Sequence, residues 1–124
     1  MILSETLNKA ARLFPRKEAI RCGDHILTYR AFAERINCLA HVLRCQGVGK
    51  DDKVAVLLPN CHCFLEVYFA VAQLGAVSAP LNFRLSTREI SFILTDSEAK
   101  VLVVDPLFST QVNELRAGEE KSIK

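Results

Sequence analysis

The spacing of apolar residues changes along the chain, and the pattern is most regular in the central segment, residues 54–80. Residues 54–58 are apolar without interruption and few in number, which is typical of a strand buried on both faces. A helix is predicted for residues 61–74, with Asn60 as its cap, and a second strand for residues 76–80. A strand, a helix and a strand with short joints form a βαβ unit, so we expect parallel strands with a right-handed crossover.

The predicted central helix has almost no polar face. At roughly 100° per residue, His62, Glu66 and Gln73 fall within about 40° of one another and form a narrow polar stripe. A helix this apolar is expected to lie between the sheet and further protein. Glu66 is then expected at a surface or a subunit seam, and not as a general base.

Two predicted elements lie between a first short helix and the central unit. Residues 18–28 read as a β-hairpin with a tight turn at Gly23-Asp24. Thr28 is placed to cap the following helix, residues 29–45, in which Tyr29 is expected to be a partly buried anchor.

The segments after the central unit continue the alternation of helix and strand. Ser86 and Glu89 fit a capping box, and the helix that they begin leads to a third buried strand at residues 100–104. Asp105, followed by a proline, begins a last helix. Residues 117–124 have no pattern and are expected to fray.

Together these elements predict the α/β fold class: a parallel-stranded sheet built from βαβ units, with helices on both faces and a β-hairpin before it. Such sheets bind ligands at the carboxyl ends of their strands. We therefore expect Pro59-Asn60, the loop 80–84 and Asp105 to lie along one functional edge.

Composition narrows the range of functions. Hydrophobic residues make up 50% and charged residues 24% of the 124 residues, which indicates one folded domain. The net charge of +2 is too small to indicate nucleic acid as a partner. No apolar run approaches the roughly 20 residues of a membrane span, and the first residues do not resemble a signal peptide.

The cysteines favour a reducing compartment, and we expect a cytoplasmic protein. There are five, an odd number, and they lie inside apolar elements. Cys61 and Cys63 flank His62, but neighbours two apart on a helix point about 200° apart, so no metal site is expected. We expect no catalytic residue either, because the chain contains neither a glycine-rich phosphate loop nor a Gly-x-Ser-x-Gly turn.

Five short motifs nevertheless occur together in a recognisable order. They are Leu27-Thr28-Tyr29-Arg30, Gly47-Val48-Gly49-Lys50-Asp51-Asp52-Lys53-Val54-Ala55-Val56, Leu58-Pro59-Asn60, Leu74-Gly75-Ala76-Val77 and Pro80-Leu81-Asn82-Phe83-Arg84-Leu85. In this order and spacing the chain resembles the N-terminal part of the adenylate-forming, AMP-binding acyl-CoA synthetases.

The resemblance implies an activity for a complete enzyme of this kind. Such enzymes use ATP and Mg²⁺ to convert a carboxylate, for example a fatty acid, into an acyl-adenylate and then transfer the acyl group to coenzyme A. On this basis residues 1–116 would belong to the large N-terminal domain, and the remainder of the synthetase would be the chain's partner. Nothing here matches the family's phosphate loop or catalytic lysine, so the isolated chain is expected to be an inactive fragment that binds at most CoA.

The resemblance also singles out a loop. In some CoA ligases that the sequence resembles, the arginine of an Asn-x-Arg-Leu motif lies near the mouth of the CoA tunnel and meets a CoA phosphate. Here that arginine is Arg84, and Asn82 would support the loop. The alternative is that Arg84 only holds the loop, through backbone carbonyls or an acidic partner, while Asn82 bonds the turn itself.

Two other functional readings remain open on the sequence. One is a non-catalytic α/β binding or interaction module derived from the same fold. The other is a flavodoxin-like nucleotide binder, which the lack of a phosphate-cradling sequence disfavours. If the chain is a fragment with a truncated sheet, the apolar helix 61–74 would be exposed, and from this we expect a homo-oligomer.

Overall fold

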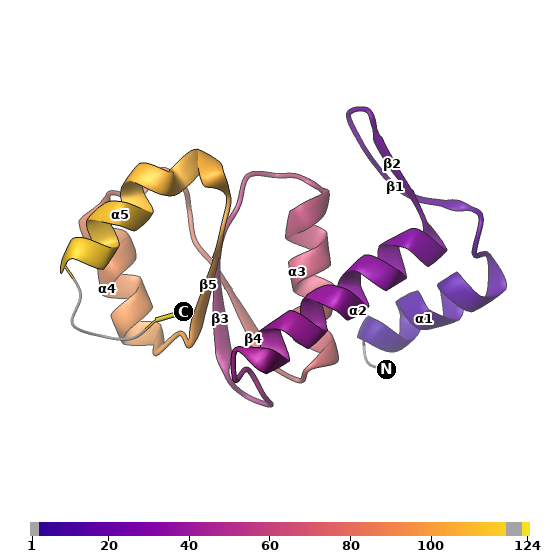
Figure 1. Cartoon of the computed structure of the whole chain (residues 1–124), viewed down its shortest axis with the longest axis horizontal. Coiled ribbons are helices and arrows are strands. Elements are labelled where there is room, and N and C mark those ends of the chain that lie inside the picture. Colours follow the sequence, from indigo (N-terminus) through magenta and orange to yellow (C-terminus); the bar gives the residue numbers. More distant parts are fainter. Residues whose placement is uncertain (1–2, 119–122) are drawn as a thin grey trace.

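The computed structural model describes residues 3–118 and 123–124 (Figure 1). The elements follow the predicted alternation. In chain order they are α1 (Leu3–Leu13), β1 (Glu18–Cys22), β2 (His25–Thr28), α2 (Tyr29–Cys45), β3 (Lys53–Leu57), α3 (His62–Gln73), β4 (Val77–Pro80), α4 (Thr87–Ser97), β5 (Val101–Val104), the 3₁₀ helix η1 (Pro106–Phe108) and α5 (Ser109–Gly118).

The central sheet has three parallel strands, as predicted, and their order is β4-β3-β5. Val54 of β3 lies opposite Ser78 on one side and Val101 on the other. The chain steps from β3 to β4 and then returns past β3 to β5. Because both crossovers are expected to be right-handed, this reversal places α3 and α4 on opposite faces of the sheet. Figure 1 shows α4 and α5 on one side of the sheet and α1, α2 and α3 on the other.

The central strand β3 separates two apolar cores. Val54 and Val56 pack among residues of α2 and α3, whereas Ala55 and Leu57 pack among residues of α4 and α5. All four of these side chains are fully buried. Alternate residues of a strand point to opposite faces, so an apolar run without interruption is what this position requires. The prediction of a strand buried on both faces is confirmed.

The hairpin and most of the helix caps also agree with the sequence. β1 and β2 pair antiparallel around a turn in which Gly23 adopts a φ of +57°, a left-handed conformation that glycine tolerates. The Thr28 hydroxyl accepts a hydrogen bond from the Ala31 N–H at 3.2 Å. Ser86 and Glu89 form the complete capping box at the start of α4.

The predicted cap of α3 is wrong. Cys61, not Asn60, is the N-cap residue, and it makes no side-chain capping hydrogen bond. The helix therefore begins at His62, one residue later than a cap at Asn60 predicts. A cysteine thiol is only a weak hydrogen-bond acceptor, which is why a cap of this kind leaves no signal in the sequence.

The predicted surface position of Glu66 is also wrong. Its side chain is 7% exposed, and its two carboxylate oxygens accept hydrogen bonds from Arg35 of α2, at 2.6 Å from Nε and 3.1 Å from Nη2. The hydrogen bond and the charge of Glu66 raise the pKa of Arg35. This fork-to-fork geometry allows a carboxylate to be buried between two packed helices.

Parts of the segment 117–124, for which we expect fraying, are among the residues that the structure describes. Ala117 and Gly118 belong to α5, and residues 119–122 lie outside the described residues. Lys124 lies beside β5, where its N–H donates to the Lys100 carbonyl and its own carbonyl accepts from the Leu102 N–H, at 3.2 and 2.7 Å. Backbone pairing of this kind needs no side-chain pattern, so the sequence gives no sign of it.

An ion pair ties the start of β5 to the loop before β3. The Asp52 carboxylate accepts from Lys100 Nζ at 2.9 Å and from the Gly49 N–H at 2.7 Å. The hydrogen bond from Lys100, followed by that from Gly49, lowers the pKa of Asp52 below its ordinary value. The ionised form is therefore favoured in the folded chain.

We expect this pair to make folding stability depend on pH. Since the folded pKa of Asp52 is depressed, its contribution is complete above the unfolded pKa of about 4 and is lost as the pH falls through the folded value. The difference in urea midpoint between the wild type and Asp52→Asn should be constant near neutral pH and shrink in acid. Parallel midpoint curves down to the lowest accessible pH would contradict this assignment.

Candidate functional site

The carboxyl ends of the three parallel strands form one edge, and the loops that leave them lie next to one another. The Leu81 N–H donates to the Val56 carbonyl at 2.8 Å, and the Asp105 N–H donates to the Leu57 carbonyl at 3.1 Å. The loop after β4 and the turn after β5 therefore flank the tip of β3. This is the edge at which open α/β sheets bind ligands.

The loop after β4 is a turn closed by hydrogen bonds. Leu81 is buried at its base, in the core beneath α4. The Asn82 side-chain oxygen accepts from the Arg84 N–H at 2.9 Å, and the Asn82 carbonyl accepts from the Leu85 N–H at 3.1 Å. The capping box of α4 follows directly. A loop held at both ends by backbone bonds needs little further ordering when it meets a ligand.

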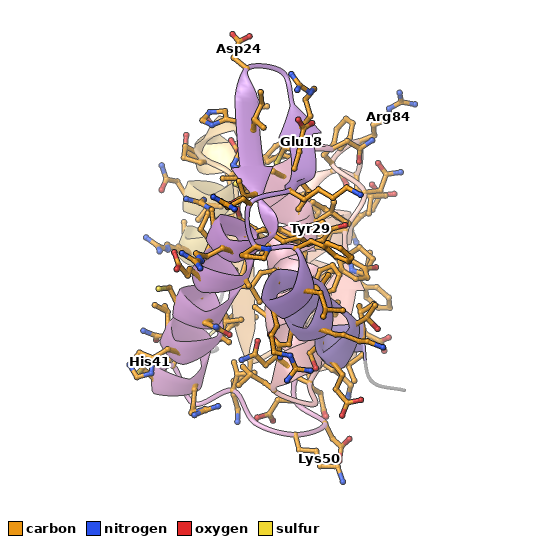
Figure 2. All side chains as sticks on the ribbon, turned by 90° about the vertical axis from the view of Figure 1, so that its right-hand side faces the viewer. Glu18, Asp24, Tyr29, His41, Lys50 and Arg84 are labelled. Atoms are coloured by element: carbon orange, nitrogen blue, oxygen red, sulfur yellow. The ribbon has the colours of Figure 1, made fainter. Side chains whose placement is uncertain are left out.

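The structure leaves the Arg84 side chain free to meet a ligand. Its guanidinium points away from the body of the molecule, at the same end as the hairpin tip Asp24 and opposite Lys50, which precedes β3 (Figure 2). Within residues 3–118 and 123–124 it makes neither a hydrogen bond nor an ion pair through its side chain. The alternative is that Arg84 holds its own loop by bonding a backbone carbonyl or an acidic side chain. Among the described residues, the Arg84 side chain makes no bond of this kind.

Sequence reasoning missed two aromatic residues, Phe83 beside Arg84 and Phe108 in contact with Phe83. Phe83 is 46% exposed as a residue, and its ring stacks against that of Phe108, with centroids 6.1 Å apart and an interplanar angle of 27°. The guanidinium carbon of Arg84 lies 5.9 Å from the centroid of Phe83. The sequence did contain a sign that Phe83 is a candidate functional residue, because an aromatic residue is unusual between an asparagine and an arginine in a polar turn. Phe108 gave none, because only the fold brings it to the same edge.

The other residues weighed in the sequence have mainly structural positions. Tyr29, visible in Figure 2, packs partly buried against the core beneath α2, and its N–H donates to the Lys17 carbonyl at 3.0 Å. The rings of His25 and His62 lie 5.0 Å apart, so the hairpin and α3 meet there. His41 lies beside Cys45 on α2, with 3.6 Å between Nε2 and Sγ.

The Cys61–Cys63 segment has the features of packed thiols. All five cysteines of the chain are free thiols. Burial, as the largest cause, raises the pKa of the Cys63 thiol, which lies 3.5 Å from His62 Nε2. Among the described residues no group of three or more His, Cys, Asp and Glu side chains is arranged to hold a metal ion. Over the same residues, no helix is long and apolar enough to cross a bilayer.

Relatives in sequence share this segment. Residues 7–124 match the model of the family described as AMP-binding enzyme. The chain is 44% identical over 110 residues to a feruloyl-CoA synthase of an Amycolatopsis species, covering 89% of this chain and 22% of that protein. It is 42% identical over 126 residues to a long-chain-fatty-acid–CoA ligase of Thermus thermophilus, covering 98% of this chain and 23% of that protein.

Solved structures agree with the sequence relatives. A Mycobacterium tuberculosis fatty acyl CoA synthetase superposes with a TM-score of 0.88 at 34% identity, covering 94% of this chain and 24% of that one. The N-terminal domain of FACL13 from the same organism gives a TM-score of 0.91 at 32% identity, covering 99% of this chain and 32% of that one. The chain thus spans about a quarter of the length of its relatives, and it belongs to the family of AMP-binding enzymes, within which it is similar to the N-terminal part of acyl-CoA ligases.

Proposed function

We propose that the chain serves as the N-terminal part of an ATP-dependent acyl-CoA synthetase. The reaction would join a carboxylate to coenzyme A, with ATP converted to AMP and pyrophosphate through an acyl-adenylate. The observation that carries the proposal is the match of residues 7–124 to the family model, together with CoA ligases that are more than 40% identical over this segment. The names of those relatives include both an aryl and a long-chain aliphatic acid, so the proposed substrate class is a carboxylic acid in general.

The two chemical steps of the proposed reaction differ in the reactants that the enzyme must bind. In the first, a carboxylate oxygen attacks the α-phosphorus of ATP and pyrophosphate leaves. In the second, the thiol of CoA attacks the acyl carbonyl and AMP leaves with the bonding electron pair. The catalytic effect of placing such reactants together is large. The exposed Arg84 at the carboxyl edge of the sheet suits a phosphate of CoA, so we place the contribution of this chain in binding the thiol substrate of the second step.

Arg84 is the residue proposed to make that contribution. Its exposed guanidinium, on a hydrogen-bonded turn at the carboxyl edge of the sheet, offers several hydrogen-bond donors to a CoA phosphate. Asn82 supports the contact indirectly, because its side chain fixes the turn on which Arg84 lies.

The proposal is tested by replacing the matching N-terminal segment of the Thermus thermophilus ligase, 23% of its length, with this chain. The purified chimera should form acyl-CoA in a reaction that requires acid, ATP and CoA. Residues 1–124 alone should release no pyrophosphate in response to an acid. A folded chimera, monitored by its thermal melting, that forms neither adenylate nor thioester would overturn the proposal, as would activity of the isolated chain.

Replacing Arg84 with alanine in this chimera should raise the KM for CoA about tenfold or more. Losing a charge-assisted hydrogen bond removes roughly 1.5–3 kcal/mol, and each 1.4 kcal/mol corresponds to about a factor of ten in affinity. The rate of acyl-adenylate formation, measured without CoA, should not change. Arg88→Ala, an exposed arginine on the next helix, is the matched control. An unchanged KM for CoA in Arg84→Ala would exclude the contact.

The exposed apolar surface supports a second proposal, that the isolated chain self-associates. Leu65 on α3, Phe92 on α4 and Leu107 in η1 are large apolar side chains at least 45% exposed. Because α3 and α4 lie on opposite faces of the sheet (Figure 1), Leu65 and Phe92 do not form one patch, and each offers apolar surface that a second copy of the chain can bury. Light scattering over a range of concentrations should show dimers or larger species, and a monomer at the highest concentration would contradict the proposal.

The free thiols further support a cytoplasmic location.

A further inference from the structure

We propose that Phe83, backed by Phe108, is the surface on which the adenine ring of coenzyme A stacks while Arg84 holds a phosphate of the same nucleotide. The identity of the ligand rests on the function proposed above. The role of Phe83 rests on the structure of the turn.

Phe83 is exposed in a place where the fold does not require an aromatic ring. The base of the turn is held by the buried Leu81 and by the hydrogen bonds of Asn82, neither of which involves the Phe83 side chain. A residue that is 46% exposed is in contact with water over much of its surface. Stacking an adenine on it would remove that apolar surface from water and bring two π systems into contact.

The ring is also held in a fixed orientation. Phe108 lies next to it, nearly parallel, and is itself packed against the core that contains Leu57 and Ile90. Phe83 is anchored through its backbone in the turn 82–85 and through its ring against Phe108. A planar surface that is positioned before the ligand arrives loses little conformational freedom on binding.

Arg84 is placed to couple the two contacts. Its guanidinium carbon is 5.9 Å from the Phe83 centroid, at the outer limit of a cation–π contact, and such contacts are weak at exposed sites. A phosphate can therefore draw the guanidinium from the ring at little energetic cost. The same movement uncovers the ring for the base. A nucleotide that carries both groups is expected to bind better than either group alone.

CoA, and not ATP, is the nucleotide proposed for this site. Phe83 and Arg84 offer one aromatic surface and one cation, which suits a base with a nearby phosphate. Both nucleotides carry these groups, and the choice of CoA follows from the function proposed above. The 3′-phospho-ADP part of CoA matches the two groups present.

The test uses NMR on isotopically labelled 1–124 with adenosine 3′,5′-bisphosphate as the probe. We expect upfield shifts of the Phe83 ring protons together with shifts of the Arg84 amide. Phe83→Leu should weaken binding about tenfold, while Phe83→Tyr should stay within about threefold. Phe92→Leu, which changes an exposed phenylalanine on α4, is the matched control and should bind like the wild type.

Other ligands show which part of the inference is wrong if the expected binding is not observed. Pantetheine, which lacks both base and phosphate, should leave the Phe83 ring unshifted, and pyrophosphate should shift Arg84 equally in the wild type and in Phe83→Leu. If CoA shifts Arg84 but Phe83→Leu has no effect on its affinity, the stacking surface is wrong and the proposed function stands. If ATP binds as tightly as the bisphosphate and depends equally on Phe83, the assignment to CoA is wrong. If no probe shifts residues 82–85, the inference is wrong, whatever activity the chimera shows.

Discussion

Replacing Leu57 with alanine is expected to destabilise the chain by about 3 kcal/mol. Leu57 is the last residue of β3 and is fully buried in the core beneath α4 and α5. Its carbonyl also accepts the Asp105 N–H at the carboxyl edge of the sheet. A cavity at this point removes packing from both the core and the edge that carries the proposed site. The loss is a large part of the roughly 5–15 kcal/mol that stabilises a typical domain.

The control for this prediction is Leu65→Ala on α3. It deletes the same atoms from a side chain that is 45% exposed, so we expect a loss of about 1 kcal/mol or less. Urea unfolding followed by circular dichroism measures both. Equal losses in the two variants would contradict the assignment of Leu57 to a closed core.

Replacing Arg35 with alanine should produce the second large effect, a loss of about 2 kcal/mol at neutral pH. The change leaves the carboxylate of Glu66, 7% exposed, without its two charge-assisted hydrogen bonds between α2 and α3. Breaking a fully buried pair in this way removes roughly 3–5 kcal/mol. The Arg35 side chain is 49% exposed, so water can partly replace it and we expect less.

Two variants separate this loss from a general effect of removing an arginine. Arg44→Ala, at an exposed position of the same helix, should change stability by no more than about 0.5 kcal/mol. The double variant Arg35→Met with Glu66→Leu removes the charge that is left unpaired, and should recover most of the stability. If the double variant is as unstable as Arg35→Ala, the buried carboxylate is not the cause.

The parts of this fold that the sequence predicts are those with local causes. An apolar run without interruption at 54–57 produces the central strand because both of its faces are covered. Ser86 and Glu89 cap α4 because their side chains reach backbone groups three residues away. Each of these features can be read in a window of a few residues.

The features that were missed depend on residues far apart in the chain. Arg35 and Glu66 are 31 positions apart, and each alone looks like an ordinary polar residue of a helix surface. Phe83 and Phe108 meet only because the loop after β4 and the turn after β5 flank the same strand. The sequence places Phe83 directly before Arg84, but only the folded chain brings the ring of Phe108 against that of Phe83.

The most direct test of the central claim, that this segment provides the CoA-binding edge of an acyl-CoA ligase, is a ¹⁵N–¹H NMR spectrum of purified 1–124. CoA is added first and ATP with Mg²⁺ second. We predict a dispersed spectrum with saturable shifts for CoA confined to the region of residues 82–85 and no saturable shifts for ATP. Saturable shifts for ATP, or a well-dispersed spectrum in which CoA leaves residues 82–85 unchanged, would contradict the account.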